Sequence, residues 1–364
     1  MSLDQTTPVM PQLSPVDEAR RQLEICNACR YCEGYCAVFP AMTRQKAFAD
    51  GDISQMANLC HNCRGCYYAC QYTAPHEFDL NLPQALAEVR VDSWQEHAWP
   101  AGLAKVFQRN GLAVAAAFVL GFALVFLAIG ALKPAGGDGF YAYLAHGAMV
   151  AIFLPAFVLP LGAIWIALRR YWRAIGGAPV KVAHLRDAFG AAARMKNLDG
   201  GQGQGCNFED KDRFSDARRK AHQLVLYGFL LCFASTSVAT LMHYLLGWHA
   251  PYGLLTPPKL LGIPGGVMLM IGTVWLARLK RQADPALGAQ GRGGAEMGFV
   301  ALLFTVAATG LALYLLRGTG AVGVMLALHL GAVLSFFLLM PYSKMVHGFF
   351  RLAALTRDAQ DKSA

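Results

Sequence analysis

Eight cysteines stand in two runs of identical spacing, and side chains in this pattern can bind iron. The runs are Cys26-x2-Cys29-x2-Cys32-x3-Cys36 and Cys60-x2-Cys63-x2-Cys66-x3-Cys70. In bacterial ferredoxins with two [4Fe–4S] clusters, the fourth cysteine of each such run ligates the other cluster. Three cysteines at three-residue intervals wrap a loop around three corners of a cluster, and the next one, on an emerging helix, points to the neighbouring site. The spacing therefore predicts cluster 1 on Cys26, Cys29, Cys32 and Cys70, and cluster 2 on Cys60, Cys63, Cys66 and Cys36.

Zinc is the alternative occupant, because four cysteines also make a zinc site. Zinc modules usually place two CxxC pairs a dozen or more residues apart, which these runs do not. One feature departs from the ferredoxin run, which ends in Cys-Pro: Ala37 and Gln71 follow the fourth cysteines here. We expect the helix that leaves each cluster to begin differently, with the ligands unchanged.

Five histidines lie within or at the ends of long apolar segments: His146, His222, His243, His329 and His347. Imidazoles inside membrane spans are uncommon and usually functional. If the third and sixth spans run antiparallel, His222 and His347 lie at an inner level and His243 and His329 at an outer one. His329 and His347 are five turns apart and share a face of one continuous helix. Two levels of paired imidazoles predict one or two b-type haems with axial histidines.

Two alternatives to this ligand set stay open. His146 can replace His243 or His329 at the outer level, and any of these histidines can instead be an interfacial residue bonded to backbone or lipid headgroups. Covalent c-type haem is excluded because the chain contains no CxxCH.

Six segments without Asp, Glu, Lys or Arg are each long enough to cross the hydrocarbon core as a helix. They are Gly111–Leu132, Phe140–Leu168, Ala221–Pro258, Leu260–Ala277, Met297–Leu316 and Gly318–Ser343. Hydrophobic residues make up 55% of the 364 residues and charged residues only 15%. The composition makes an ordinary soluble enzyme unexpected and predicts six transmembrane helices.

The net charge of +9 is divided unevenly along the chain. The first 110 residues have a net charge of −3 and the rest +12, so the basic character belongs to the apolar part and does not indicate nucleic-acid binding. Twenty Lys and Arg residues fall on one side of the predicted spans, twelve of them in the loop 169–220, and three fall on the other. The positive-inside rule then places both termini and the cysteine runs in the cytoplasm, with acidic lipid headgroups as neighbours of the basic segments.

We therefore expect a mainly α protein with an N-terminal dicluster ferredoxin-type domain followed by a six-helix transmembrane bundle. The expected divisions are a cytoplasmic cluster domain at 1–105, a membrane b-haem domain at 106–350 and a cytoplasmic tail at 351–364. No paired carboxylates, Ser/His/Asp constellation or Walker loop is visible, so we expect no organic-substrate site and no catalytic residue of that kind.

Several longer segments, spread over about residues 15–357, resemble the tricarballylate-utilization protein B family (TcuB, also called CitB). The segments are CHNCRGCYYACQY, APHEFDLNLPQALAEVR, CNFEDKDRFSDARRKAHQLVLYGFLLCF, LMHY and HLGAVLSFFLLMPYSKMVHGFFRLAAL. The resemblance implies a multi-pass protein of the inner (cytoplasmic) membrane. It would carry electrons from the reduced flavin (FADH2) of a partner FAD-dependent tricarballylate dehydrogenase through two [4Fe–4S] clusters and haem b to the membrane quinone.

Other functions fit parts of the sequence. The electron flow could be reversed, with quinol oxidised to feed a heterodisulfide- or nitrate-reductase-like partner. A redox-sensing membrane protein would use the clusters as a switch, but no output module follows the last span. A tricarboxylate transporter would leave the eight spaced cysteines without a role.

Overall fold

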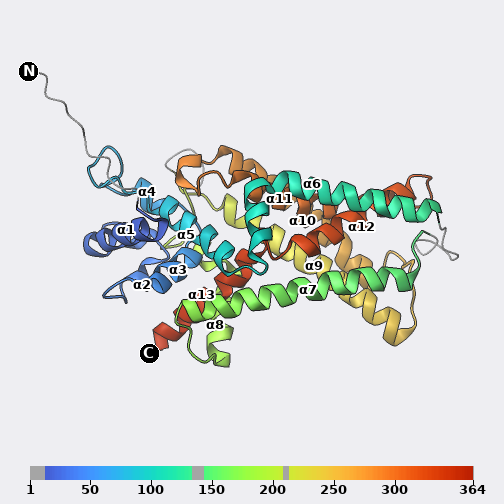
Figure 1. Ribbon diagram of the computed structural model, residues 1–364, viewed down its shortest axis with the longest axis horizontal. Coiled ribbons are helices and arrows are strands. Elements are labelled where there is room, and N and C mark those ends of the chain that lie inside the picture. The colour runs from blue at the N-terminus through green and yellow to red at the C-terminus, as the bar shows by residue number, and fades with distance from the viewer. Residues whose placement is uncertain (1–12, 133–142, 208–212, 364) are drawn as a thin grey trace, which may run out of the picture.

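The computed structural model describes residues 13–132, 143–207 and 213–363, and almost all of this chain is helical (Figure 1). Its extended pairing is an isolated bridge between Cys206 and Ser215, and no strand occurs in the described ranges. A small globular part lies at one end of a group of long helices (Figure 1). The predicted mainly α fold class is confirmed.

The globular end, called the head here, comprises residues 13–98. Its elements are α1 (Pro15–Cys29), η1 (Glu33–Tyr35), α2 (Phe39–Met42), α3 (Asp50–Leu59), α4 (Gly65–Tyr68) and α5 (Leu82–His97). The first helix begins as expected from its sequence, because the Ser14 side chain accepts a hydrogen bond from Asp17 N at 3.1 Å and Pro15 occupies the first turn. These short helices and their connecting loops carry both cysteine runs.

The bundle consists of six helices that are long and apolar enough to cross a membrane. They are α6 (Ala101–Leu132), α7 (His146–Ala174), α9 (Ala217–Leu246), α10 (Pro257–Gln282), α11 (Gly293–Leu315) and α12 (Val322–Leu339). Shorter elements connect them: α8 (Val182–Arg194) and η3 (Lys196–Leu198) between α7 and α9, and η4 (Pro285–Leu287) between α10 and α11. The six predicted apolar helices are thus present.

The last predicted span ends earlier than the charge-free segment suggests. Helix α12 stops at Leu339, and a separate helix, α13 (Val346–Ser363), begins after a short irregular stretch. That stretch contains Pro341, whose ring nitrogen has no proton to continue a helical ladder. His329 and His347 therefore lie on different helices, and the expectation that they share one face of a continuous helix is wrong.

Residues 351–363 form most of α13 instead of a separate tail. Ala354 and Leu355 of this helix, together with Ala188 of α8, belong to the same hydrophobic core as Leu23 and Ile53 of the head. The C-terminus accordingly lies beside the head (Figure 1). Helices α8 and α13 thus pack against the head and contribute to its core.

A second apolar core joins the head to the bundle. It contains Trp94 of α5, Tyr171 of α7 and Phe350 of α13, and the rings of Tyr171 and Phe350 have centroids 4.6 Å apart. Tyr171 is fully buried, and its hydroxyl donates to the carbonyl of Ser54 at 3.3 Å. Residues from three distant parts of the chain thus hold the head against the end of α7.

Glycines allow neighbouring bundle helices to approach closely, as small residues commonly do in membranes. A Cβ atom on Gly228 of α9 would lie 2.6 Å from the backbone nitrogen of Leu269 in α10. A Cβ on Gly265 of α10 would lie 2.8 Å from the Cβ of Leu231 in α9. The pairing of α9 with α10 therefore depends on glycine at these positions.

We predict that Gly228→Ala destabilises the bundle, because the added methyl group must displace the backbone of α10. Overpacking of this kind costs about 1–3 kcal/mol. The measurement is thermal unfolding of the detergent-solubilised protein. Gly162→Ala in α7 is the matched control, since nothing lies within 4 Å of its added Cβ; equal melting temperatures for the two variants would contradict the prediction.

Candidate metal centres

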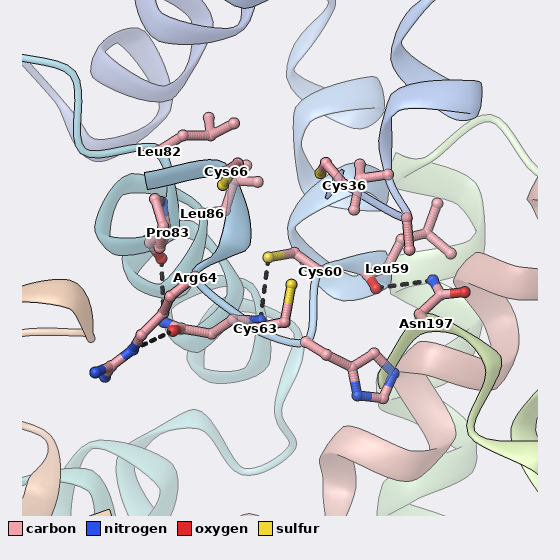
Figure 2. A pocket seen from close by; sticks show the side chains of 14 residues that line it. Cys36, Leu59, Cys60, Cys63, Arg64, Cys66, Leu82, Pro83, Leu86 and Asn197 are labelled. Atoms are coloured by element: carbon pink, nitrogen blue, oxygen red, sulfur yellow. Dashed lines mark hydrogen bonds between the residues drawn. The ribbon is translucent and has the colours of Figure 1, made fainter. Parts of the chain in front are cut away.

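The first of two cysteine-lined pockets, called the cluster-2 pocket here, draws on both cysteine runs (Figure 2). Cys60 directly follows α3, Cys63 lies in the next loop and Cys66 lies in α4. Cys36 comes from the other run, immediately after η1. The rest of the wall is largely apolar and includes Leu59, Leu82, Pro83 and Leu86.

The second pocket, called the cluster-1 pocket here, lies at the end of α1. Cys26 and Cys29 occupy the last turn of α1, Cys32 follows the helix, and Cys70 follows α4. Tyr31, Gln71, Tyr72 and Leu80 complete much of the wall. The Tyr31 side chain is 67% exposed, so this pocket reaches the outer surface of the head.

Each pocket thus contains three cysteines of one run and the fourth cysteine of the other. This is the grouping that the spacing predicts, and Ala37 and Gln71 in place of proline do not prevent it. Four sulfurs spread around a pocket wall fit a multi-iron group better than one tetrahedral zinc ion.

Backbone and side-chain amides surround the cysteine sulfurs. Asn62 N donates to Cys60 Sγ at 3.3 Å, and Tyr72 N donates to Cys70 Sγ at 3.3 Å. Asn62 and Arg64 have φ angles of 54° and 68°, in the left-handed region that non-glycine residues seldom adopt. Hydrogen bonds to cluster sulfurs are one of the main ways in which a protein sets the reduction potential.

Burial also affects the protonation of the cysteines in the iron-free chain. It raises the pKa of the Cys26 thiol and of the Cys60 thiol, and at Cys60 the positive charge of Arg90 opposes the rise. Iron binds the thiolate, so assembly of a cluster must release protons here.

The sequence reasoning did not identify three arginines that bind the loop Cys60–Arg64. Arg90 donates to the carbonyl of Cys60 at 2.6 Å, and Arg351 donates to the same carbonyl at 2.7 Å. Arg218 donates to the carbonyl of Asn62 at 2.7 Å. In the sequence, Arg218 and Arg351 counted only toward membrane orientation and Arg90 had no assigned role, because nothing in a single chain shows which carbonyl a distant arginine binds.

Cys206 is a further residue at the cluster-2 pocket that the spacing did not indicate. It is 1% exposed, it packs against Cys63, and its thiol donates to the carbonyl of Leu198 at 3.2 Å. The next residue, Asn207, donates its backbone N–H to the carbonyl of Cys63 at 2.8 Å. The segment leading to Cys206 is therefore part of the pocket wall.

His222 and His347 come together between the head and the bundle, at the level that the sequence predicts as the inner one. Their ring centroids are 5.8 Å apart, with an angle of 68° between the ring planes. Histidine nitrogens bind metals at about 2.0 Å, so two imidazoles on opposite sides of one metal have centroids roughly 6 Å apart. These two histidines, called the inner His pair here, are the residues that would hold one haem iron between them.

The hydrogen bonding of the inner His pair also suits metal ligands. Nδ1 of His347 bonds to the carbonyl of Lys344, which leaves Nε2 for a metal. Burial, followed by the nearby charge of Arg351, lowers the pKa of His347 well below its ordinary value, so its ring is neutral as a ligand must be. Nδ1 of His222 is buried and has no hydrogen-bond partner within the described ranges.

The outer level differs from the predicted pair. His243 stacks on His146, with centroids 4.2 Å apart and 24° between the planes. The ring of His249 is tilted by 41° against that of His243, with centroids 4.3 Å apart. His329 instead bonds through Nδ1 to Thr309 Oγ1 at 3.1 Å. The structure thus places the alternative ligand His146, and not His329, beside His243. Rings 4.2 Å apart do not fit an iron bound between them.

The fold and these sites define a class of protein: an apolar helical bundle of the membrane type that carries a ferredoxin-like iron–sulfur head. A family described as "Citrate utilization protein B Fer4-like domain" matches residues 19–98, and one described as "Citrate utilization protein B" matches residues 103–364. The chain therefore belongs to the citrate utilization protein B family, as the resemblance of its sequence segments predicts.

One relative shows how far this similarity extends. The chain is 42% identical to Citrate utilization protein B of Escherichia coli over 354 residues, which cover 96% of this chain and 93% of the relative. No solved structure matches the chain. The two family matches meet near residue 100, close to the predicted domain boundary at 105.

We predict that Cys70→Ala removes the same electron paramagnetic resonance signal as Cys26→Ala, although the two cysteines belong to different runs. Cys66→Ala should remove a different signal. Iron content should fall by about half in each variant, because one of two four-iron groups is lost. Cys232→Ala is the control, since Cys232 lies in α9 and lines neither pocket. A common signal lost in both Cys70→Ala and Cys66→Ala would contradict the grouping.

Proposed function

We propose that this protein is the electron-transfer subunit through which a flavoprotein dehydrogenase delivers electrons to membrane quinone. The observation that carries the proposal is that the inner His pair, with ring centroids 5.8 Å apart, lies next to the loop of the cluster-2 pocket. Arg218 and Arg351, each one helical turn from a histidine of the pair, donate hydrogen bonds to that loop. Family membership and the Fer4-like head support an electron-transfer role.

The proposed cofactors are two [4Fe–4S] clusters and one haem b. Cys26, Cys29, Cys32 and Cys70 hold one cluster, Cys36, Cys60, Cys63 and Cys66 hold the other, and His222 and His347 hold the haem. When bound, these groups accept and release one electron at a time. They can therefore pass the two electrons of a reduced flavin singly to the quinone, which is confined to the lipid. The chain's own residues would bind these groups and fix the spacing between head and bundle.

The proposed donor is the reduced flavin of an FAD-dependent tricarballylate dehydrogenase, and the proposed acceptor is the membrane quinone. The name of the Escherichia coli relative refers to citrate utilization, and citrate is a tricarboxylate, which is consistent with a partner that oxidises a tricarboxylate. The proposed location is the inner membrane, with the head and both termini in the cytoplasm. The twenty basic residues on the head side of the spans, against three on the other, support this orientation.

The test is anaerobic mixing of the purified full-length protein with the flavoprotein dehydrogenase and tricarballylate. We expect the α band of reduced haem b to appear, and to disappear again when a soluble quinone analogue is added. Haem that stays oxidised with the dehydrogenase but is reduced by quinol would instead support the reverse direction. A purified protein without dithionite-reducible haem would rule out the membrane half of the proposal.

We predict that His222→Ala and His347→Ala each lose most of the bound haem, because an iron left with one axial imidazole loses half of its protein ligands. The measurement is the pyridine haemochrome content per protein chain, with iron–sulfur content determined in parallel. His184→Ala is the control, because His184 is a buried histidine of α8 that bonds to Ser363 at the end of α13. Full haem content in both variants would contradict the ligand assignment.

A further inference from the structure

Two arginines lie one helical turn from the imidazoles of the inner His pair. Arg218 precedes His222 by four residues in α9, and Arg351 follows His347 by four residues in α13. Residues four apart lie on nearly the same face of a helix. Each helix therefore presents one imidazole and one guanidinium in the same direction.

Both guanidinium groups bind the loop Cys60–Arg64 of the cluster-2 pocket. Arg218 Nη1 donates to the carbonyl of Asn62 at 2.7 Å, and Arg351 Nη2 donates to that of Cys60 at 2.7 Å. Arg351 Nε also donates to the carbonyl of Asn58 at 3.0 Å, so its planar group binds two carbonyls, of Asn58 and Cys60, at the end of α3. Charged donors of this kind make the stronger hydrogen bonds of proteins.

His61 stands in this loop, between Cys60 and Cys63, and forms part of the pocket wall. Arg218 and Arg351, each one turn from a member of the inner His pair, donate hydrogen bonds to this loop. The loop is therefore the part of the head that faces the inner His pair. A second connection runs through Trp94, whose ring lies 6.5 Å from that of His347 and whose Nε1 donates to Asn58 Oδ1 at 2.9 Å.

The cluster-1 pocket lacks such links. Within the described ranges, no hydrogen bond joins its segments 26–32 and 70–72 to α9 or α13. Its wall includes Tyr31, which is 67% exposed. The two pockets are thus not equivalent: one reaches the outer surface of the head and the other contacts the helices of the inner His pair.

We propose that electrons leave the head through the cluster-2 pocket, and that Arg218 and Arg351 are positioning residues that hold its loop against the inner His pair. This inference rests on the proposed function. In the step, one electron passes from the group held by Cys36, Cys60, Cys63 and Cys66 to the iron held by His222 and His347. With both groups bound, the cysteines would hold the one-electron donor and the histidines the one-electron acceptor, so one would be oxidised as the other is reduced, with no proton or covalent bond transferred. Reduced flavin resupplies the electron through the cluster-1 pocket.

The two arginines also influence the stability of the reduced state at the cluster-2 pocket. A reduced cluster carries one more negative charge than an oxidised one, and nearby positive charge stabilises it. Loss of either guanidinium therefore lowers the midpoint potential of this cluster, in addition to loosening the loop. A residue that served only folding would not change that potential while the iron content stayed constant.

The experiment measures haem reduction by stopped-flow absorbance in the full-length protein, with photoreduced flavin mononucleotide as the probe donor. In Arg351→Gln and Arg218→Gln, we expect the rate to fall about tenfold, as the loss of one charged hydrogen bond to the loop implies. The midpoint potential of the cluster-2 signal should fall, with haem content and iron content unchanged. Arg351→Lys keeps the positive charge but cannot bind the carbonyls of both Asn58 and Cys60 as the guanidinium does. The midpoint potential of the cluster-2 signal should therefore stay near the wild-type value, while the rate of haem reduction falls.

Arg357→Gln is the matched control, since Arg357 lies on the same helix and donates to a carbonyl, that of Ile175, away from the cluster-2 pocket. Its rate and potential should equal those of the wild type. Wild-type rates and potentials in Arg351→Gln and Arg218→Gln would overturn the inference, and so would an Arg357→Gln effect as large as theirs. If a Gln variant loses haem, the Arg351→Lys variant becomes the test. A wild-type rate of haem reduction in that variant would overturn the inference. A wild-type protein without haem or clusters contradicts the proposed function itself.

Discussion

The carbonyl groups of the loop Cys60–Arg64 are bound by guanidinium groups from three helices, and the arrangement of the molecule depends on these contacts. Arg90 comes from the head, Arg218 from the first turn of α9 and Arg351 from α13. A loop that must wrap around a metal group cannot satisfy its carbonyls through a regular helix or sheet, and buried carbonyls without donors are costly. The arginines satisfy them and, in doing so, join the head to the helices of the inner His pair.

Two further basic residues lie at the head end of the bundle. Lys280 and Lys344 both bind Glu296 of α11, at the head end of the bundle. Buried cations are tolerated when an anion lies close by, and iron–sulfur clusters and haem propionates are anionic. The same basic residues that indicate orientation in the sequence thus also surround the region where the proposed cofactors bind.

Much of the fold followed from local physical rules. Charge-free segments of sufficient length predict the six apolar helices, and the repeated cysteine spacing predicts which sulfurs gather in each pocket. Both patterns act through the chain itself: the length of a helix sets whether it can cross a bilayer, and three-residue spacing sets how a loop surrounds a cluster. The stop of α12 at Leu339 was missed because Pro341 lies inside an otherwise uniform apolar segment.

The sequence by itself determined the type of each candidate ligand, the grouping of the cysteines and the inner pairing of His222 with His347. Only the tertiary structure decided that His243 stacks on His146 rather than facing His329, because that depends on how α7 and α9 pack. It also decided that α13 joins the core of the head, and that Cys206, Arg218 and Arg351 surround one pocket. Contacts between residues more than 100 positions apart leave no local pattern in a single chain, since each partner is an ordinary cysteine or arginine until the fold brings it to its neighbour.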